Sequence, residues 1–266
     1  MRRRLDAELV RRGLTASRQR ALEEIGAGRV LVGGLPARSA ARRVAADESI
    51  RVSGEGPRFV SRGGEKLAAA LDHFDVDVTD RRALDAGAST GGFTDCLLQA
   101  GAAHVVAVDV GRGQLAWSLR TDPRVTVLER TNVRHLTPDD IGGRVDLCTA
   151  DLSFISLTVC APALARCVTP DADLVLLVKP QFEAGRRDVG KGGVVRDASV
   201  HRSVLRRVRD GLAAAGIDAV SAMPSPLRGA DGNVEFFFHA RTDGDRAIGD
   251  DALDVVVDRA HTGVLP

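Results

Sequence analysis

Lysine is nearly absent from this chain, because only Lys66, Lys179 and Lys191 occur among its 37 basic residues. Arginine stays charged inside proteins, whereas lysine is a compact point charge that responds to its surroundings. A lysine kept in an arginine-rich sequence is therefore a candidate for proton chemistry or for stabilising a localised anion. Composition and chance explain any one lysine equally well, so the neighbouring residues must decide between the two interpretations.

Paired cysteines and long apolar runs are also missing. Cys96, Cys148, Cys160 and Cys167 lie in apolar runs without C-x-x-C spacing, which favours buried free thiols over disulfides or zinc sites. The longest apolar stretches, such as 174–178, fall far below the roughly 18 residues of a membrane-spanning helix. The basic N-terminus has no apolar segment behind it, so we expect no secretory signal and a cytoplasmic location. Six histidines are scattered, and we expect no metal site.

A net charge of +1 conceals a segregation of charge along the chain. Residues 1–62 hold 14 basic and 7 acidic residues, whereas the rest of the chain holds 23 basic and 29 acidic residues. A basic segment attached to an acidic body is typical of a polyanion-binding module joined to a separate catalytic or structural domain. We therefore predict a small N-terminal α+β domain over 1–56, a linker over 57–62 and a larger domain over 63–266.

The small domain is predicted to contain two basic helices followed by strands. Apolar residues recur at helical spacing in two stretches between residues 5 and 25, and Ser17 stands where a helix cap is expected. Short segments at 29–34 and 49–54 have the composition of strands. Basic helices are often simply solvated, so charge alone leaves nucleic-acid binding open.

The larger domain alternates between β-rich runs and helical patterns. Such alternation predicts an α/β, Rossmann-like fold with a mostly parallel seven-stranded sheet and helices on both faces. The predicted strands cover 83–87, 103–110, 125–129, 145–151, 173–180, 217–223 and 234–240. A helix with Lys66 in its first turn precedes them, further helices are predicted near 93–100, 115–120, 157–167 and 199–214, and a last one covers 250–260.

A glycine-rich loop, GASTGGF over 87–93, joins the first strand to its helix. Glycines let a backbone approach a ligand closely, and the start of the helix adds free N–H groups. The G-x-G-x-x-G spacing of dinucleotide sites is absent, because Ser89 takes the place of the second glycine. The order acid-x-Gly-x-x-x-Gly, which begins at Asp85, is instead typical of S-adenosylmethionine methyltransferases.

Asp109 ends the second strand, where an acid accepts hydrogen bonds from ribose hydroxyls. A simple strand-end cap is the alternative role. Asn132 and Val133 follow the third strand and are expected to border an adenine ring. The full set of predicted cofactor contacts is Asp85, Gly87, Ala88, Ser89, Thr90, Gly91, Gly92, Phe93, Asp109, Val110, Asn132, Val133 and Asp151.

Charged residues also stand at the ends of later strands. Asp151 and Lys179 end two consecutive strands, and Glu235 interrupts an apolar one. Because ligands of parallel sheets bind at the carboxyl ends of strands, we expect these charges to meet the cofactor. A carboxylate in an apolar strand is costly unless it is paired, and Lys66 offers a partner. The competing interpretation is a structural Asp151–Lys179 ion pair with Glu235 as an edge-strand charge.

Several motifs together carry a family resemblance. The pattern RLDAELVRRGLTASRQRALEEIGAGRVLVGG resembles the RNA-binding module first described in a ribosomal small-subunit protein. Lys66, Asp151, Lys179 and Glu235 around GASTGGFTD match the K-D-K-E tetrad of FtsJ-like RNA ribose 2′-O-methyltransferases. With SRGGEKL, ADLSFISL, VKPQFE and GNVEFF, these motifs resemble the TlyA (hemolysin A) family of ribosomal RNA 2′-O-methyltransferases over residues 2–242.

The resemblance implies S-adenosylmethionine-dependent 2′-O-methylation of ribosomal RNA, with cytidines of 16S and 23S rRNA as expected targets. Lys179 would stabilise the emerging alkoxide, and its carboxylate neighbours should keep it charged. Asp151 would orient Lys179, while Lys66 and Glu235 would fix the ribose. A membrane-active hemolysin and a non-catalytic RNA-binding assembly factor are the alternatives.

The expected partners are ribosomal RNA or ribosomal subunits, with no membrane and no metal, and we expect a monomer. Phosphate contacts release counterions and supply much of the affinity for RNA. Phe59 and Trp117 are the obvious aromatic residues outside strands for base stacking, although Trp117 is expected to pack on the cofactor side of the sheet. Lys191 is expected on a loop beside the active site. The predicted RNA-binding residues are Arg3, Arg4, Arg11, Arg18, Arg20, Arg62 and Arg134.

Overall fold

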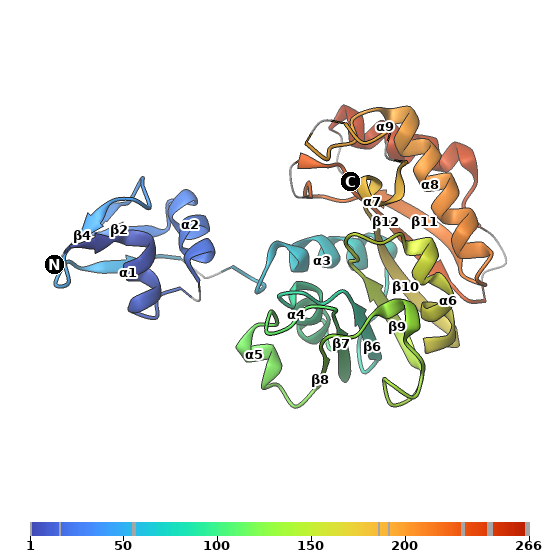
Figure 1. Cartoon of the computed structure of the whole chain (residues 1–266), viewed down its shortest axis with the longest axis horizontal. Coiled ribbons are helices and arrows are strands. Elements are labelled where there is room, and N and C mark those ends of the chain that lie inside the picture. Colours follow the sequence, from blue (N-terminus) through green and yellow to red (C-terminus); the bar gives the residue numbers. More distant parts are fainter. Residues whose placement is uncertain are drawn as a thin grey trace. The chain divides into compact units, whose positions relative to one another are not determined.

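The computed structural model describes residues 2–15, 17–54, 57–185, 187–190, 192–229, 232–243 and 247–263. The chain divides into two compact units, Met1–Pro57 and Arg58–Pro266 (Figure 1). Lys191, which was expected beside the active site, lies outside the described residues.

The first unit packs two helices against short strands. Its elements are β1 (Arg3–Arg4), α1 (Leu5–Arg11), α2 (Arg18–Gly26), β2 (Val30–Val32), β3 (Leu35–Pro36), β4 (Arg43–Val44) and β5 (Ile50–Val52). β2 pairs with β3 and β5, and β1 pairs with β4. Ser17 caps α2 as predicted, since its Oγ accepts a hydrogen bond from the Arg20 N–H at 3.1 Å. Leu5, Leu9 and Val30 form the centre of this unit's core.

The second unit is built on one seven-stranded sheet in the order β11-β12-β10-β9-β6-β7-β8. Strands β6 to β10 pair in parallel, while β12 runs antiparallel to β10 and β11. The predicted mostly parallel sheet is therefore confirmed. The bounds are β6 (Arg82–Ala86), β7 (His104–Val108), β8 (Val125–Leu128), β9 (Val145–Ala150), β10 (Val168–Val178), β11 (Asp218–Pro224) and β12 (Phe236–Arg241). β10 begins earlier than predicted, because Val168 already pairs with Val145 before the register shifts.

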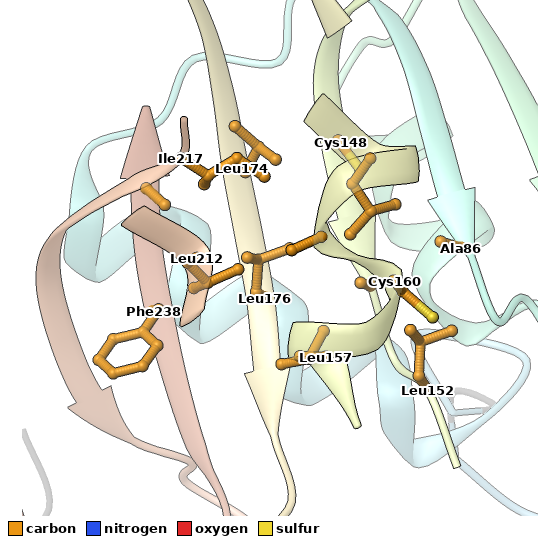
Figure 2. Packing of buried hydrophobic residues seen from close by; sticks show 14 of the residues in the cluster. Ala86, Cys148, Leu152, Leu157, Cys160, Leu174, Leu176, Leu212, Ile217 and Phe238 are labelled. Carbon is orange, nitrogen blue, oxygen red and sulfur yellow. The ribbon is translucent and has the colours of Figure 1, made fainter. Parts of the chain in front are cut away.

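Helices cover both faces of this sheet (Figure 1). α3 (Arg62–Phe74), α4 (Gly92–Gln99) and α5 (Trp117–Arg120) share a core on one face, and α6 (Leu157–Cys167), α8 (Ala198–Ala213) and α9 (Asp250–Thr262) share a core on the other. The side chains of β12 alternate between these cores: Phe236 and Phe238 enter the second, Phe237 the first. Figure 2 shows Phe238 in the core that also holds Leu176, Leu212 and Leu157. Burial on both faces explains the near-continuous apolar runs of these strands.

The cysteines and the apolar segments agree with what the sequence predicts. All four cysteines are buried and free, as predicted. Within the described part of the chain, we found no helix with both the length and the apolar character needed to cross a bilayer.

The strand order reverses at β6, which lies between β7 and β9. From β6 the chain proceeds to β7 and β8 on one side, then crosses to β9 and β10 on the other. The carboxyl ends of strands at such a reversal form the ligand-binding crevice of open α/β sheets. The loops that follow β6, β7, β9 and β10 are therefore the place to look for a site.

The starts of α3 and α4 touch beside this crevice. A Cβ atom at Gly92, the first residue of α4, would lie 2.1 Å from Ser61 Oγ and 3.0 Å from the Gly64 backbone nitrogen. Ser61 caps α3 by accepting the Gly63 N–H, so its side chain cannot rotate away without losing that bond. Gly92 therefore serves the contact between two helices.

We expect Gly92→Ala to lower the free energy of unfolding by about 1–3 kcal/mol, the usual effect of overpacking. Urea unfolding of the purified chain measures this. Gly249→Ala is the matched control, because an added Cβ there meets nothing within 4 Å. Equal unfolding midpoints for the two variants would contradict the packing role.

Candidate active site

The loop after β6 touches the end of β9. Gly87 has φ +89°, and a Cβ atom there would lie 2.6 Å from the Asp151 carbonyl oxygen. The Asp151 N–H donates to the Ala86 carbonyl at 2.9 Å. Gly91 caps α4 with φ +97°, where a side chain would collide with Leu119. Both glycines are required by the backbone conformation, and Gly87 also brings the predicted cofactor loop against Asp151, a predicted catalytic residue.

Asp109, which follows β7, organises the other side of this loop. Its Oδ2 accepts the Ser89 N–H at 2.8 Å, and its Oδ1 accepts the Gly111 N–H at 2.6 Å. Asp109 and Ser89 line a small pocket together with Ala88, Gln114 and Glu129. A carboxylate has about four acceptor sites, so Asp109 can still accept hydrogen bonds from two ribose hydroxyls. Asp109 therefore lines this pocket with acceptor sites that the two backbone N–H groups leave unused.

Asp85 and Phe93 lie beneath the loop, away from this pocket. Asp85 is fully buried, and its Oδ2 accepts a hydrogen bond from Thr94 Oγ1 at 2.6 Å. Burial raises the pKa of Asp85 to about 7 against the opposing hydrogen bond from Thr94. The Phe93 ring stacks near Phe237, with centroids 6.2 Å apart, inside the core. Both side chains support the loop from below.

The remaining predicted cofactor residues differ in exposure, and only some of them lie at the pocket. Ser89 and Thr90 are exposed at the loop surface. Val110 is 67% exposed, Val133 is buried in the core, and the Asn132 side chain accepts the Arg134 N–H at 3.0 Å. Val110, Val133 and Asn132 are not among the described residues that line the small pocket.

The first ion pair of the site joins the ends of β9 and β10. Lys179 Nζ lies 2.5 Å from Asp151 Oδ1 and donates to Ser153 Oγ at 2.9 Å. An ammonium group has three protons, and among the described residues Ser153 is the one that accepts a hydrogen bond from it, while Asp151 holds the group by charge. Parallel pairing of Leu176 with Ala150 brings these two strand ends together.

The second ion pair joins α3 to the start of β12. Lys66 Nζ lies 2.5 Å from Glu235 Oε2, and both side chains are buried. A Cβ atom at Gly229 would lie 2.0 Å from Glu235 Oε1, so the segment before β12 packs directly on this carboxylate. Because Val178 pairs with Phe236, the next residue, Lys179, and the preceding one, Glu235, lie at the same edge of the sheet. The four predicted catalytic residues thus form two ion pairs, one between the ends of β9 and β10 and one between α3 and the start of β12.

Aromatic side chains beside Lys179 were missed from the sequence. Phe154 is 91% exposed and has φ +64°, a left-handed conformation that is rare for a bulky residue. Its ring centroid lies 5.0 Å from that of Phe182, and Lys179 Nζ lies 5.9 Å from the Phe182 ring. Phe154 stands three residues after Asp151 and Phe182 three residues after Lys179, and this spacing from the two charged strand ends is the signal that could have revealed them.

The two aromatic residues that were named from the sequence behave differently. Phe59 is buried under Gly64, with the Arg58 guanidinium 4.7 Å from its ring centroid. Trp117 was expected to pack against the sheet, and this was wrong: it is 75% exposed. Its short helix buries Leu119 instead, which directs Trp117 outward.

Four of the five predicted RNA-binding arginines in the first unit are held by carboxylates. Asp6 pairs with Arg4 at 3.1 Å and with Arg18 at 2.8 Å, and Glu8 pairs with Arg11 at 2.6 Å. Arg20 pairs with Glu23 at 2.6 Å. Asp6 and Glu8 are buried while Arg11 and Arg18 stay largely exposed, so the carboxylates fix the cations and leave guanidinium donors free.

The other predicted arginines remain accessible. Arg3 is exposed and forms no ion pair with any described residue, and Arg62 and Arg134 are exposed in the second unit. Among the described residues, no group of three or more histidine, cysteine or acidic side chains is arranged to hold a metal ion.

Comparison with known proteins gives a consistent result. The sequence pattern of the FtsJ-like methyltransferase family matches residues 59–242. The chain is 57% identical to the 16S/23S rRNA (cytidine-2′-O)-methyltransferase TlyA of Mycobacterium tuberculosis, over 97% of this chain and 96% of that protein. It is 46% identical to YqxC of Bacillus subtilis, a candidate rRNA methyltransferase, over 97% of this chain and 94% of that protein. A solved hemolysin candidate from Streptococcus thermophilus superposes with TM-score 0.79 at 39% identity, covering 98% and 96% of the two chains.

The raised pKa of Asp85 predicts a dependence of stability on pH. The native state keeps a proton up to about pH 7. The unfolded state loses it near pH 4, so the free energy of unfolding should fall as the pH rises between these values. Asp85→Asn removes the ionisation, and its stability relative to the unmodified chain should rise by about 2–3 kcal/mol between pH 5 and 7. Urea unfolding at several pH values measures the difference, and parallel pH curves would contradict a buried, protonated Asp85.

Proposed function

This chain belongs to the FtsJ-like methyltransferase family, and we propose that it transfers a methyl group from S-adenosylmethionine to a ribose 2′-hydroxyl of ribosomal RNA. It is a methyltransferase whose relatives include TlyA-type rRNA (cytidine-2′-O)-methyltransferases. We further propose cytidines of both 16S and 23S rRNA as targets, because the chain covers nearly the whole of the relative named for both. The reaction then takes place in the cytoplasm, on ribosomal RNA or on ribosomal subunits.

The observation that carries this proposal is the geometry of Lys179. Asp151 holds the ammonium group by charge and Ser153 accepts one of its protons, so a further proton is available to a substrate oxygen. A ribose 2′-oxygen that accepts a hydrogen bond from this ammonium group has a positive charge beside it while its hydroxyl proton leaves to water and negative charge develops on the oxygen. Preorganised charge of this kind favours the transition state more than the ground state. Asp151 holds the ammonium in place, and the Lys66–Glu235 pair closes the other side of the sugar site.

We propose that the cofactor binds beside β6 and β7, with its nucleoside against the residues that line the small pocket. When bound, S-adenosylmethionine supplies an electrophilic methyl group. Asp109 would accept hydrogen bonds from its ribose, and Ala88, Ser89 and Gln114 would contact the nucleoside. Gly87 would let the loop approach the cofactor while it contacts Asp151. We keep Asp85, Gly91, Gly92 and Phe93 as residues that shape this loop.

The RNA side of the site is proposed to involve Phe154. An exposed aromatic ring next to a catalytic lysine offers a stacking surface for an unpaired base, as single-stranded RNA recognition requires. Arg62, Arg134 and the arginines of the first unit would bind phosphates. The carboxylate-held arginines are preorganised for this, because their rotamers are already fixed.

Methyl transfer to purified 30S and 50S subunits tests the function. The chain is incubated with S-adenosylmethionine carrying a tritiated methyl group, and the rRNA is then hydrolysed in alkali. We expect label in alkali-resistant dinucleotides, because a 2′-O-methyl group blocks cleavage of the adjacent phosphodiester. Leakage of dye from liposomes without methyl incorporation would instead favour the hemolysin alternative, and tight RNA binding without incorporation would favour an assembly factor.

Lys179→Arg should reduce kcat about 100-fold or more while leaving cofactor affinity within about twofold. The guanidinium keeps the charge but cannot reproduce the single ammonium directed by Asp151 and Ser153. Fluorescence of Trp117, the only tryptophan of the chain, can report cofactor binding because it follows the pocket residues Gln114 and Leu115. Full turnover by this variant would remove Lys179 from the mechanism.

Phe154→Ala should raise KM for rRNA about tenfold or more, because stacking of one base is worth about 1–3 kcal/mol. Phe154→Trp, which keeps an aromatic face, should restore most of the affinity, whereas Phe154→Leu should not. Steady-state kinetics with subunits as the varied substrate measure the change. If Leu and Trp behave alike, Phe154 contributes apolar contact without stacking.

A further inference from the structure

Two segments form the Lys179 side of the site, and three sets of contacts join them. Residues 151–156 connect β9 to α6. Residues 179–183 follow β10 and contain α7 (Pro180–Glu183). The first set consists of the Lys179 contacts with Asp151 and Ser153. The second is the contact between the rings of Phe182 and Phe154. The third set consists of hydrogen bonds to the Glu183 carboxylate from Ser156 and Leu157.

Glu183 binds the start of α6 with both of its oxygens. Oε2 accepts a hydrogen bond from Ser156 Oγ at 2.6 Å, and Oε1 accepts the Leu157 N–H at 2.7 Å. Burial raises the pKa of Glu183, and these two hydrogen bonds act in the opposite direction. A carboxylate is therefore kept in a costly environment to make two directed contacts.

Ordinary helix capping does not account for these two hydrogen bonds. Ser156 is itself the N-cap of α6 and accepts the Thr158 N–H at 3.1 Å, as a local cap does. Glu183 comes from a different connection of the sheet, 26 residues further along the chain from Leu157. What it adds to the local cap is a fixed distance between the two segments.

Phe154 depends on such a constraint. Its left-handed backbone conformation is unfavourable and persists only when both ends of the segment are held. The Asp151 N–H is bound to the Ala86 carbonyl on one side, and Ser156 is bound to Glu183 on the other. Loss of the Glu183 contacts would release the second end and let Phe154 and Ser153 move relative to Lys179.

We propose that Glu183 is a positioning residue for methyl transfer, which sets the spacing between the exposed Phe154 ring and the ammonium group of Lys179. Glu183 touches neither substrate in this role and acts through Ser156 and Leu157. The proposal rests on the function proposed above, since it assumes that Lys179 and Phe154 bind one target nucleotide. A misplacement of about 1 Å at a reacting group is enough to reduce turnover about 100-fold.

The experiment compares Glu183→Gln and Glu183→Ala with the unmodified chain in methyl transfer to subunits. Glu183→Ala removes both contacts, and we expect kcat to fall about 10- to 100-fold. Glu183→Gln keeps one carbonyl oxygen for the Leu157 N–H, so we expect a smaller loss and activity between the other two. Cofactor affinity, followed by Trp117 fluorescence, should stay within about twofold because Glu183 lies outside the nucleoside pocket. If Glu183→Ala fails to fold, the isosteric Glu183→Gln carries the test.

Asp197→Ala is the matched control for a loss of helix stability. Asp197 caps α8 in the same chemical way, since its Oδ1 accepts the Ser199 N–H and the Ser199 hydroxyl, each at 2.8 Å. It makes no contact with residues 151–156 among the hydrogen bonds and ion pairs of the described chain. We expect this variant to lose thermal stability and keep its kcat. Equal losses of kcat in Asp197→Ala and Glu183→Ala would reduce Glu183 to a structural cap and overturn the proposal.

A double-mutant cycle with Phe154→Ala separates positioning from general damage. If Glu183 acts through Phe154, the combined loss in kcat/KM should be smaller than the product of the two single losses. Fully multiplicative losses, or Glu183 variants as active as the unmodified chain, would overturn the proposal. Absence of methyl transfer by the unmodified chain would instead contradict the proposed function, so the two failures are distinguishable.

Discussion

A buried lysine needs a carboxylate, and this requirement shapes the edge of the sheet where the four candidate catalytic residues lie. Lys66 and Glu235 are buried together, and Lys179 is held by Asp151. Removing one member of such a pair would leave an uncompensated charge, which is strongly destabilising. The positions of Asp151, Lys179 and Glu235 follow from the register of β9, β10 and β12, and α3 supplies Lys66. The same pairing that makes the charges tolerable also orients an ammonium group toward the crevice.

Much of the second unit could be predicted because its signals are local. Apolar runs buried on both faces predict parallel strands, and glycines at Gly87 and Gly91 indicate where the backbone needs a positive φ. Placing Asp151 and Lys179 at strand ends was enough to predict a shared edge, because parallel strands end together. The cap of α2 at Ser17 was equally local.

Other features depend on tertiary contacts that the sequence does not encode locally. Asp85 and Phe93 belong to the loop motif, yet the pleat of β6 and the turn of α4 direct them into the core. Gly92 faces α3, which lies outside the loop, and Gly229 is explained only by the nearby Glu235 carboxylate. Trp117, which was expected to pack against the sheet, is exposed, whereas Phe59, which was expected to be available for stacking, is buried. Exposure depends on which neighbouring residue fills the core. In the first unit, the buried Asp6 and Glu8 turn a basic composition into a set of oriented arginines.

We propose that the Lys179 ammonium group donates a hydrogen bond to the ribose oxygen that receives the methyl group. A structure of the chain bound to S-adenosylhomocysteine and a ribosomal RNA fragment tests it most directly. We expect one 2′-oxygen within about 3–3.5 Å of Lys179 Nζ, on the line that leads to the cofactor sulfur. A cofactor bound away from Asp109, or a target 2′-oxygen that contacts neither Lys179 nor the crevice between β9 and β10, would contradict it.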